Sequence, residues 1–356
     1  MASRKEDHLA LCADGPVGFR QTTTLLECVH LVHDALPDMA LADVDTTLTL
    51  LGKPLRAPLL IASMTGGTDK AASINRDLAS IAEQRGYGFG LGSQRTMHAR
   101  PETAPTFRVR SVAPTALVLG NVGVTQAREM TASELARLVG DVGADAVCLH
   151  LNPAMELVQP EGDRDFRDGL TTIRHVVEHI GIPVIVKETG CGLAPSVGLR
   201  IRAVGVRHVD VSGAGGTSWV GVETLRATAA GDEGGRTLGD LLWDWGVPTA
   251  ASIALMAPLG FDTVIATGGI ATGLDVARAI ALGATAAGIA RPVLRALSHG
   301  GAAEAVAYLA RIETELRAVM LLTGCRTLSD LQRTPRIIDG ALQGWISRLG
   351  NPNRFD

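Results

Sequence analysis

The sequence predicts an α/β fold with a parallel sheet, and three observations support this prediction. Eight short apolar runs recur along the chain, each with Gly, Ser, Asn or Thr at or near its end. Most are separated by stretches whose apolar residues recur at helical spacing, as in 131–144 and 273–284. The chain has 356 residues, which is enough for eight strand–helix units. The predicted fold is therefore a (β/α)8 TIM barrel with an N-terminal extension.

The eight apolar runs are typical of strands that are buried on both faces, because polar residues do not alternate regularly with apolar ones. They occupy residues 57–63, 86–93, 116–123, 146–152, 183–189, 208–213, 262–269 and 284–291. A doubly wound open sheet is the alternative architecture. It fits less well, because an open sheet places its site at one switch point whereas polar groups end all eight of these strands.

The remaining segments frame the predicted barrel. We expect residues 1–56 to form an extension that covers the barrel mouth and residues 57–356 to form the barrel domain. Residues 302–349 have a helical pattern and close the chain. No linker or low-complexity segment divides the molecule, so the barrel is expected to be one unit.

Composition excludes several classes of protein. The chain is 46% hydrophobic and 20% charged, with a net charge of −4 and no long basic run, so no nucleic-acid partner is expected. No apolar run approaches the length of a membrane span, and the first residues, MASRKEDHLALC, lack the apolar core of a signal peptide. The odd number of cysteines, five, without CxxC spacing indicates free thiols in a reducing compartment. We expect a cytoplasmic protein without a membrane partner.

The segment HLNPAME (150–156) places polar groups at the end of the fourth predicted strand. Side chains alternate along a strand, so Cys148, His150 and Asn152 share one face. The opposite face carries Val147, Leu149 and Leu151, which suit the helix layer. The first face therefore points into the barrel, with Glu156 in the following loop. Catalytic groups of such barrels lie at this end of the strands.

Three glycine-rich loops follow the last three predicted strands. They are SGAGGTS (212–218), IATGGIATG (265–273) and GIARP (288–292). Backbone N–H groups at the start of a helix can bind a phosphate, and TIM barrels often bind one between their last two loops. One such loop alone is often a bare turn, but three neighbouring ones predict a phosphate site.

Basic residues are expected at the same mouth. Lys187 ends the fifth predicted strand, where a buried ammonium needs an anionic partner. That partner is either a neighbouring carboxylate or the negative charge of a reduced flavin. Arg4, Lys5 and His8 lie in a segment that is either a solvated tail or, if the extension folds over the barrel, a grip for a polyphosphate. Arg95 adds a planar donor suited to a diphosphate.

Ordered motifs along nearly the whole chain carry a family resemblance. They are RKEDHL (4–9), MTGGT (64–68), GLGSQR (90–95), GNVG (120–123), HLN (150–152), PEGDRDF (160–166), VKETG (186–190), VDVSGAGGTSW (209–219), GVPTA (246–250), TGLDVARAIALGA (272–284) and LLTGCRTLSDL (321–331). In these motifs the chain resembles the type II, flavin-dependent isopentenyl diphosphate isomerases. The resemblance implies reduced FMN, Mg²⁺, NADPH as the reductant, a prenyl diphosphate substrate and a homo-tetramer or octamer. It also implies a double-bond shift with reduced flavin as acid and base and a cation-like intermediate.

The resemblance also implies site residues. Those matching the flavin site are Ser63, Met64, Thr65, Ser93, Asn121, Lys187, Ser212 and Thr217, with Gly268, Gly269, Ala290 and Arg291 at its phosphate end. Those matching the substrate site are Arg4, Lys5, His8, Ser93, Gln94, Arg95, Asn152 and Met155. Those expected to be catalytic are His150, Met155, Lys187, Trp219 and Glu223. Glu156 is the expected Mg²⁺ ligand, since proteins commonly hold Mg²⁺ with one carboxylate, substrate phosphates and water.

The chain departs from the family pattern at two positions. Met155 stands where the family has a glutamine implicated in catalysis, and Ala271 stands where it usually has an arginine. A thioether cannot relay a proton. Three interpretations follow: an isomerase that tolerates Met155, a divergent enzyme that isomerises or cyclises a longer prenyl diphosphate, or a binding protein without catalysis. The retained Glu156 and Lys187 argue against the third.

A different class shares the predicted barrel, the FMN-dependent 2-hydroxyacid oxidases. They need a histidine base beside the flavin and an arginine for the substrate carboxylate. The HLN strand and the basic N-terminal cluster fit that chemistry poorly.

Overall fold

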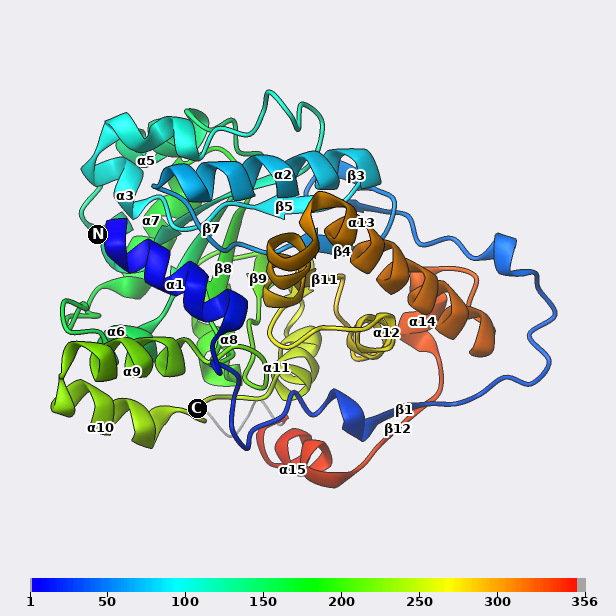
Figure 1. The fold of residues 1–356 in the computed structure, drawn as a ribbon. Helices are drawn as coiled ribbons and strands as arrows, with labels where there is room; N and C mark the ends of the chain where they lie inside the picture. The colour runs from blue at the N-terminus through cyan, green and yellow to red at the C-terminus, as the bar shows by residue number, and fades with distance from the viewer. Residues whose placement is uncertain (1, 351–356) are drawn as a thin grey trace.

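The computed structural model describes residues 2–350, and its centre is a closed barrel of eight parallel strands (Figure 1). The strands are β4 Leu59–Ile61, β5 Gly88–Gly90, β6 Val118–Gly123, β7 Ala146–Leu151, β8 Val184–Glu188, β9 His208–Asp210, β10 Thr263–Ala266 and β11 Ala286–Ile289. The last strand pairs with the first, with Gly288 beside Leu60. All eight predicted strands are confirmed, and closure excludes the open sheet.

Helices surround the barrel. They are α2 Asp69–Arg85, α3 Arg95–Ala99, α4 Val124–Arg128, α5 Ala132–Gly140, α6 Pro153–Val158, α7 Gly169–His179, α8 Pro195–Ala203, α9 Trp219–Ala230, α10 Glu233–Leu242, α11 Thr249–Met256, α12 Gly273–Ala281 and α13 Arg291–Leu322. Capping explains where the two predicted helices begin. The side chains of Thr131 and Thr272 each accept a hydrogen bond from the backbone N–H three residues on, and the carboxylates of Glu134 and Asp275 accept one from the backbone N–H of these threonines.

The barrel interior has an apolar floor and a polar upper layer. Cys148 belongs to the apolar cluster inside the barrel, whereas Leu149 packs in the cluster shared with the helices, so the predicted alternation of β7 is confirmed. Leu50 and Leu55 reach the interior cluster from a hairpin outside the barrel, β2 Leu48–Leu50 with β3 Lys53–Leu55. His150, next along the inward face of β7, begins the polar layer.

The residues before β4 contact both ends of the barrel. Helix α1, Ala2–Asp14, contacts α9 and α13, and its Arg4, Lys5 and His8 side chains lie at the barrel mouth. Farther on, β1 Val29–Leu31 pairs antiparallel with β12 Arg336–Ile338. The hairpin then closes the other end.

The C-terminal part is mostly helical, with α14 Leu328–Arg333 and α15 Gly340–Leu349 on either side of β12. All five cysteines are free. Within residues 2–350, no helix combines the length and the apolar character needed to cross a membrane.

Candidate active site

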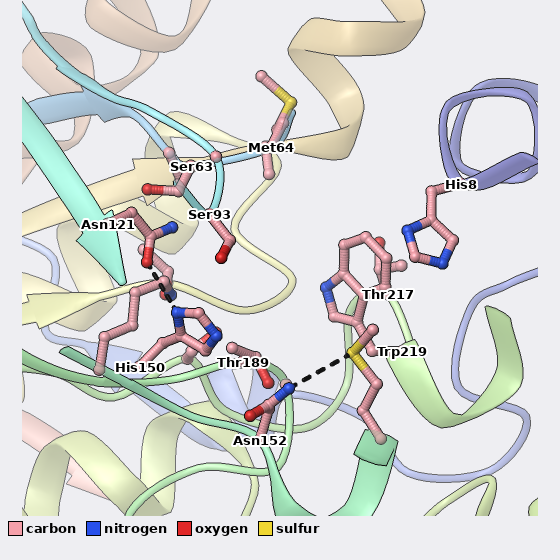
Figure 2. A pocket seen from close by; sticks show the side chains of 18 of the residues that line it. His8, Ser63, Met64, Ser93, Asn121, His150, Asn152, Thr189, Thr217 and Trp219 are labelled. Atoms are coloured by element: carbon pink, nitrogen blue, oxygen red, sulfur yellow. Dashed lines mark hydrogen bonds between the residues drawn. The ribbon is translucent and has the colours of Figure 1, made fainter. Parts of the chain in front are cut away.

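The main cavity lies at the carboxyl ends of the barrel strands and has a volume of about 370 Å³. This is the size of a small-molecule site, at the end of the barrel where such sites form. Strand ends and loops form its base, and α1 contributes Arg4, Lys5 and His8. Figure 2 shows Asn121 and His150 on one side of the cavity, with Trp219 and His8 across from them. The extension and the barrel therefore build one site together.

His150 is held as a neutral imidazole with a defined orientation. The side-chain amide of Asn121 donates to Leu91 O at 3.0 Å, so its oxygen faces His150 as an acceptor. His150 Nδ1 lies 2.9 Å from that oxygen and donates its proton there, as the dashed line in Figure 2 marks. Burial, with the nearby charges of Lys187, Lys5 and Arg95, lowers the pKa of His150 to about 3. The unprotonated Nε2 is left as an acceptor at the cavity.

Lys187 lies one strand away and forms a buried ion pair. Its Nζ is 3.0 Å from Asp210 Oδ2 and 3.3 Å from Thr267 Oγ1. The neighbouring carboxylate foreseen as one alternative is thus present. Lys187 nevertheless also lines the cavity. Asp210 holds the ammonium in place at the cavity wall without removing it from reach of a ligand.

Two of the glycine-rich loops, 212–218 and 265–273, pack against each other in the cavity wall beside Lys187. A Cβ atom on Gly216 would lie 2.3 Å from Gly269 N, and one on Gly268 would lie 2.2 Å from Gly213 O. Only glycine fits these contacts, and the positive φ of Gly268 and Gly269 favours it further. Closely packed glycine backbone therefore forms much of this part of the cavity, the glycine wall, beside side chains such as Thr217 and Thr267.

Helix α13 begins beside this wall. Its N-terminal residue, Arg291, lines the cavity, as does the preceding Ala290. Anions are stabilised at a helix N-terminus. The Arg291 guanidinium is turned toward α1 and donates to Cys12 O at 2.9 Å and to Gly15 O at 2.6 Å. Arg291 therefore joins this side of the cavity to the end of α1.

The basic cluster predicted in the N-terminal segment is brought together with Arg95. Arg4, Lys5, His8 and Arg95 all line the cavity. Burial and the charge of Arg4 lower the pKa of Lys5 to about 8. The Nε atom of Arg4 is buried without a partner among the described residues. The charges of Arg4, Lys5 and Arg95 favour a polyanionic ligand, whereas burial lowers the pKa of His8.

Glu223 supports this cluster from behind. It is 0% exposed and does not line the cavity, in contrast to the neighbouring Trp219. Its carboxylate lies 2.7 Å from His8 Nε2 and 2.6 Å from Arg226 Nη1. Burial alone would raise the pKa of Glu223, but the bonds and charges of His8 and Arg226 outweigh burial and lower it. Glu223 thus fixes His8 rather than reaching the cavity.

Helix α6 brings Met155 and Glu156 into the wall of the cavity. Asn152 Nδ2 donates to Glu156 Oε1 at 2.8 Å, and Asp163 N donates to Oε2 at 2.8 Å. Each carboxylate oxygen keeps a further lone pair for a ligand. The Met155 sulfur lies 4.0 Å from Asn152 Nδ2, which is at most a weak contact. A dashed line that starts at Asn152 marks this contact in Figure 2.

The cavity fits FMN and Mg²⁺ in different ways. For FMN, the glycine wall and the start of α13 offer a phosphate cradle, and Thr65, in a smaller adjoining hollow, has a buried Oγ1 without a partner among the described residues. For Mg²⁺, no group of three or more His, Cys, Asp or Glu side chains within residues 2–350 could hold a metal ion. A single carboxylate such as that of Glu156 is enough for a Mg²⁺ ion whose other ligands are substrate phosphates and water.

Most of the residues predicted for the site line this cavity. They are Arg4, Lys5, His8, Ser63, Met64, Ser93, Arg95, Asn121, His150, Asn152, Met155, Glu156, Lys187, Ser212, Thr217, Trp219, Gly268, Gly269, Ala290 and Arg291. Thr65, Gln94 and Glu223 do not. Thr65 lines a smaller adjoining hollow. The side chain of Gln94 turns into the interior, donating to Leu138 O at 3.0 Å and accepting from Asn121 N at 3.0 Å, so this position does not support the predicted substrate contact.

The sequence reasoning missed Gln126, Gln159, Thr189 and Thr267 in the cavity wall, and Asp210 as the partner of Lys187. Asp210 lies two residues before Ser212 at the end of the sixth barrel strand, so the alternation used for His150 could have identified it. Gln159 follows Met155 by four residues, a helical spacing that also places the two on one face.

Known proteins resemble this chain in sequence. The model of the FMN-dependent dehydrogenase family matches residues 152–338. An isopentenyl-diphosphate delta-isomerase of Methanosarcina barkeri is 42% identical over 350 residues, covering 98% of this chain and 95% of its own. Enzymes of the same name from Methanothermobacter thermautotrophicus and Aeropyrum pernix are 41% and 42% identical, over 98% and 96% of this chain and 97% and 91% of theirs.

Solved structures with the same fold are more distant in sequence. A mandelate oxidase variant with an FMN adduct is 20% identical, with a TM-score of 0.65 over 95% of this chain and 100% of its own. A Pediococcus acidilactici protein described as a lactate oxidase is 17% identical, with a TM-score of 0.66 over 95% of this chain and 93% of its own. At such low identity these structures establish the barrel fold alone.

Proposed function

Because this chain belongs to the type II, FMN-dependent isopentenyl-diphosphate delta-isomerase family, we propose that it converts isopentenyl diphosphate to dimethylallyl diphosphate with reduced FMN and Mg²⁺. The observation that carries the proposal is the meeting of two clusters at one cavity. The basic side chains of α1 and Arg95 line the same cavity as Glu156, as binding a metal-bound diphosphate requires, and the glycine wall offers a separate phosphate site. NADPH is proposed as the reductant, and a homo-tetramer or octamer as the assembly.

The side chains have distinct tasks in this proposal. Arg4, Lys5, His8 and Arg95 bind the diphosphate, and Glu156 holds Mg²⁺ against it. Reduced FMN supplies the acid and base that add one proton to the substrate and remove another. Lys187 stabilises negative charge at the cavity wall.

Two further side chains act on the hydrocarbon end. His150 remains neutral, so it adds no charge that would repel a cation-like substrate, and its Nε2 can accept a hydrogen bond. The indole of Trp219 offers an apolar, electron-rich face to the same end of the substrate.

The test is turnover under defined conditions. FMN-loaded protein, reduced anaerobically, is mixed with Mg²⁺ and isopentenyl diphosphate in D₂O, and deuterium incorporation and dimethylallyl diphosphate are followed by NMR. Turnover that Glu156→Ala abolishes supports the proposal. Absence of turnover that Met155→Gln restores would assign the natural chain to another substrate.

The alternative proposal is that the chain acts on a longer prenyl diphosphate, which it isomerises or cyclises through a carbocation. The observation in its favour is Met155, whose polarizable sulfur shares the cavity with Trp219. Geranyl and farnesyl diphosphate in the same assay decide between the two. The oxidase alternative predicts oxygen consumption with 2-hydroxyacids, which the same protein preparation can be used to measure.

A further inference from the structure

Gln159 is a buried glutamine of the cavity wall whose side-chain amide has an unmet hydrogen-bond donor. It follows α6 directly, is 2% exposed, and its Nε2 has no partner among the described residues. The side chain lines the same cavity as Glu156. Buried amide groups are almost always hydrogen-bonded, and an unmet one carries a desolvation penalty. Such a donor at a cavity wall indicates an acceptor brought by a ligand.

The backbone around this donor is firmly held. Gln159 N donates to Met155 O at 3.1 Å, and Gln159 O accepts from Gly162 N at 3.0 Å and from Arg164 Nη2 at 2.9 Å. The side-chain amide of Gln159 therefore extends from a fixed backbone position. A nearby glutamine shows the ordinary arrangement: Gln126 also lines the cavity, but its Nε2 donates to Asp163 Oδ2 at 2.9 Å.

The acceptor is identified by its surroundings. Gln159 lies three residues after Glu156, whose carboxylate already accepts from Asn152 and from Asp163 N. Helix α6 therefore carries the proposed metal ligand and leads directly into a cavity-lining residue with an unmet N–H donor. A phosphoryl oxygen of a metal-bound diphosphate meets both, as cation ligand and as hydrogen-bond acceptor.

We propose that Gln159 Nε2 donates a hydrogen bond to a phosphoryl oxygen of the substrate diphosphate at the Glu156 end of the cavity. The inference rests on the proposed function and adds a specific substrate-positioning residue to it. It gives this amide a role in binding the headgroup and none in proton transfer.

The test uses two readouts that move in opposite directions. Gln159→Met keeps the length of the side chain but removes the unmet donor, so the free, FMN-loaded protein should unfold at the same temperature as wild type or higher. The same variant should bind inorganic pyrophosphate with Mg²⁺ roughly tenfold more weakly by calorimetry, which is the loss expected for one hydrogen bond to a charged oxygen.

Gln94→Met is the matched control for stability. Gln94 is also a buried glutamine, but both ends of its amide are bonded, so this variant should unfold at a lower temperature. Gln159→Asn keeps an amide yet shortens it by one methylene, and it should bind pyrophosphate several-fold more weakly. If Gln159→Met does not fold, the pyrophosphate affinity of Gln159→Asn still tests the role of the amide.

The outcomes separate this inference from the proposed function. If wild type binds pyrophosphate and both Gln159 variants bind it equally well, the role of Gln159 is overturned while the diphosphate site stands. A loss of stability in Gln159→Met matching that of Gln94→Met, without a loss of affinity, would assign Gln159 a purely structural role. No binding by wild type would overturn the diphosphate site and this inference together.

Discussion

His8 Nε2 lies 2.7 Å from Glu223 Oε1, in a contact between residues 215 positions apart that joins α1 to α9. Neither side chain is more than 10% exposed. Because the carboxylate holds His8 at the cavity, the proposed diphosphate site depends on a residue that does not line it. A second contact between the same helices, Asp7 with Arg226 at 3.3 Å, lies at the surface.

Glu223→Ala should therefore weaken both the fold and the substrate site. Removing one partner of a buried charged pair destabilises by about 3 kcal/mol. We expect pyrophosphate affinity to fall roughly tenfold, because His8 and Arg226 lose their common partner. Urea unfolding and calorimetry measure the two effects. Asp7→Asn, which breaks only the exposed contact, should change stability by less than about 1 kcal/mol. Equal effects of the two substitutions would show that the buried contact has no special role.

Gly268→Ala should abolish tight FMN binding. The added Cβ would lie 2.2 Å from Gly213 O, so the glycine wall must move apart. Gly181, after α7, also has positive φ but no atom within 4 Å of its Cβ position. Gly181→Ala therefore tests backbone strain alone, with an expected loss of about 1 kcal/mol and unchanged FMN affinity. FMN fluorescence titration distinguishes the two. Retention of FMN by Gly268→Ala would argue against a phosphate site at this wall.

The stability of the protein should fall in mild acid, in part through His150. The imidazole has a pKa near 6.5 in the unfolded chain and about 3 in the folded protein, so the unfolded chain binds more protons between these values. The contribution of His150 is thus fully present above pH 6.5 and is lost as pH falls toward 3. At pH 5 the loss is about 2 kcal/mol.

This acid effect can be isolated by comparison with His150→Gln, which keeps an N–H donor and cannot titrate. The free energy of unfolding, measured in urea at pH 7 and pH 5, should fall by about 2 kcal/mol more in wild type than in the variant. The same pH dependence in both proteins would mean that His150 is protonated in the folded state at pH 5.

Met155→Leu tests whether the sulfur has a chemical role. The substitution nearly conserves volume, so we expect stability to change by less than about 1.5 kcal/mol. If Met155 is only filler in an isomerase, turnover of isopentenyl diphosphate should stay within about threefold, since no charge or hydrogen bond is lost. A tenfold or larger loss, seen by NMR with unchanged pyrophosphate affinity, would show that the sulfur interacts with the reacting carbons.

The fold and the inward face of β7 could be predicted because their signals are local. Period-two alternation places Cys148 and His150 inside the barrel whatever the rest of the chain does. Capping boxes at Thr131 and Thr272 likewise mark helix starts within four residues of sequence.

Gln94 and Glu223 could not be placed in this way. A motif gives the identity of a residue but not the direction of its side chain. Gln94 turns inward because Leu138 O, on α5, offers its amide an acceptor. Glu223 lies behind the cavity because α1, far away in sequence, brings His8 to it. These positions are decided by contacts that form only after the barrel has assembled.

The pairing of β1 with β12 bears on the order of events during synthesis. Val29–Leu31 has its strand partner in Arg336–Ile338, about three hundred residues later. The ribosome therefore releases this segment long before the strand that it must meet. Such distant pairing slows folding and leaves an unpaired edge exposed in the meantime. The nascent chain would thus assemble most of its barrel before β1 can pair with β12. The N-terminal segment therefore reaches its native position only after the C-terminal residues have been synthesised.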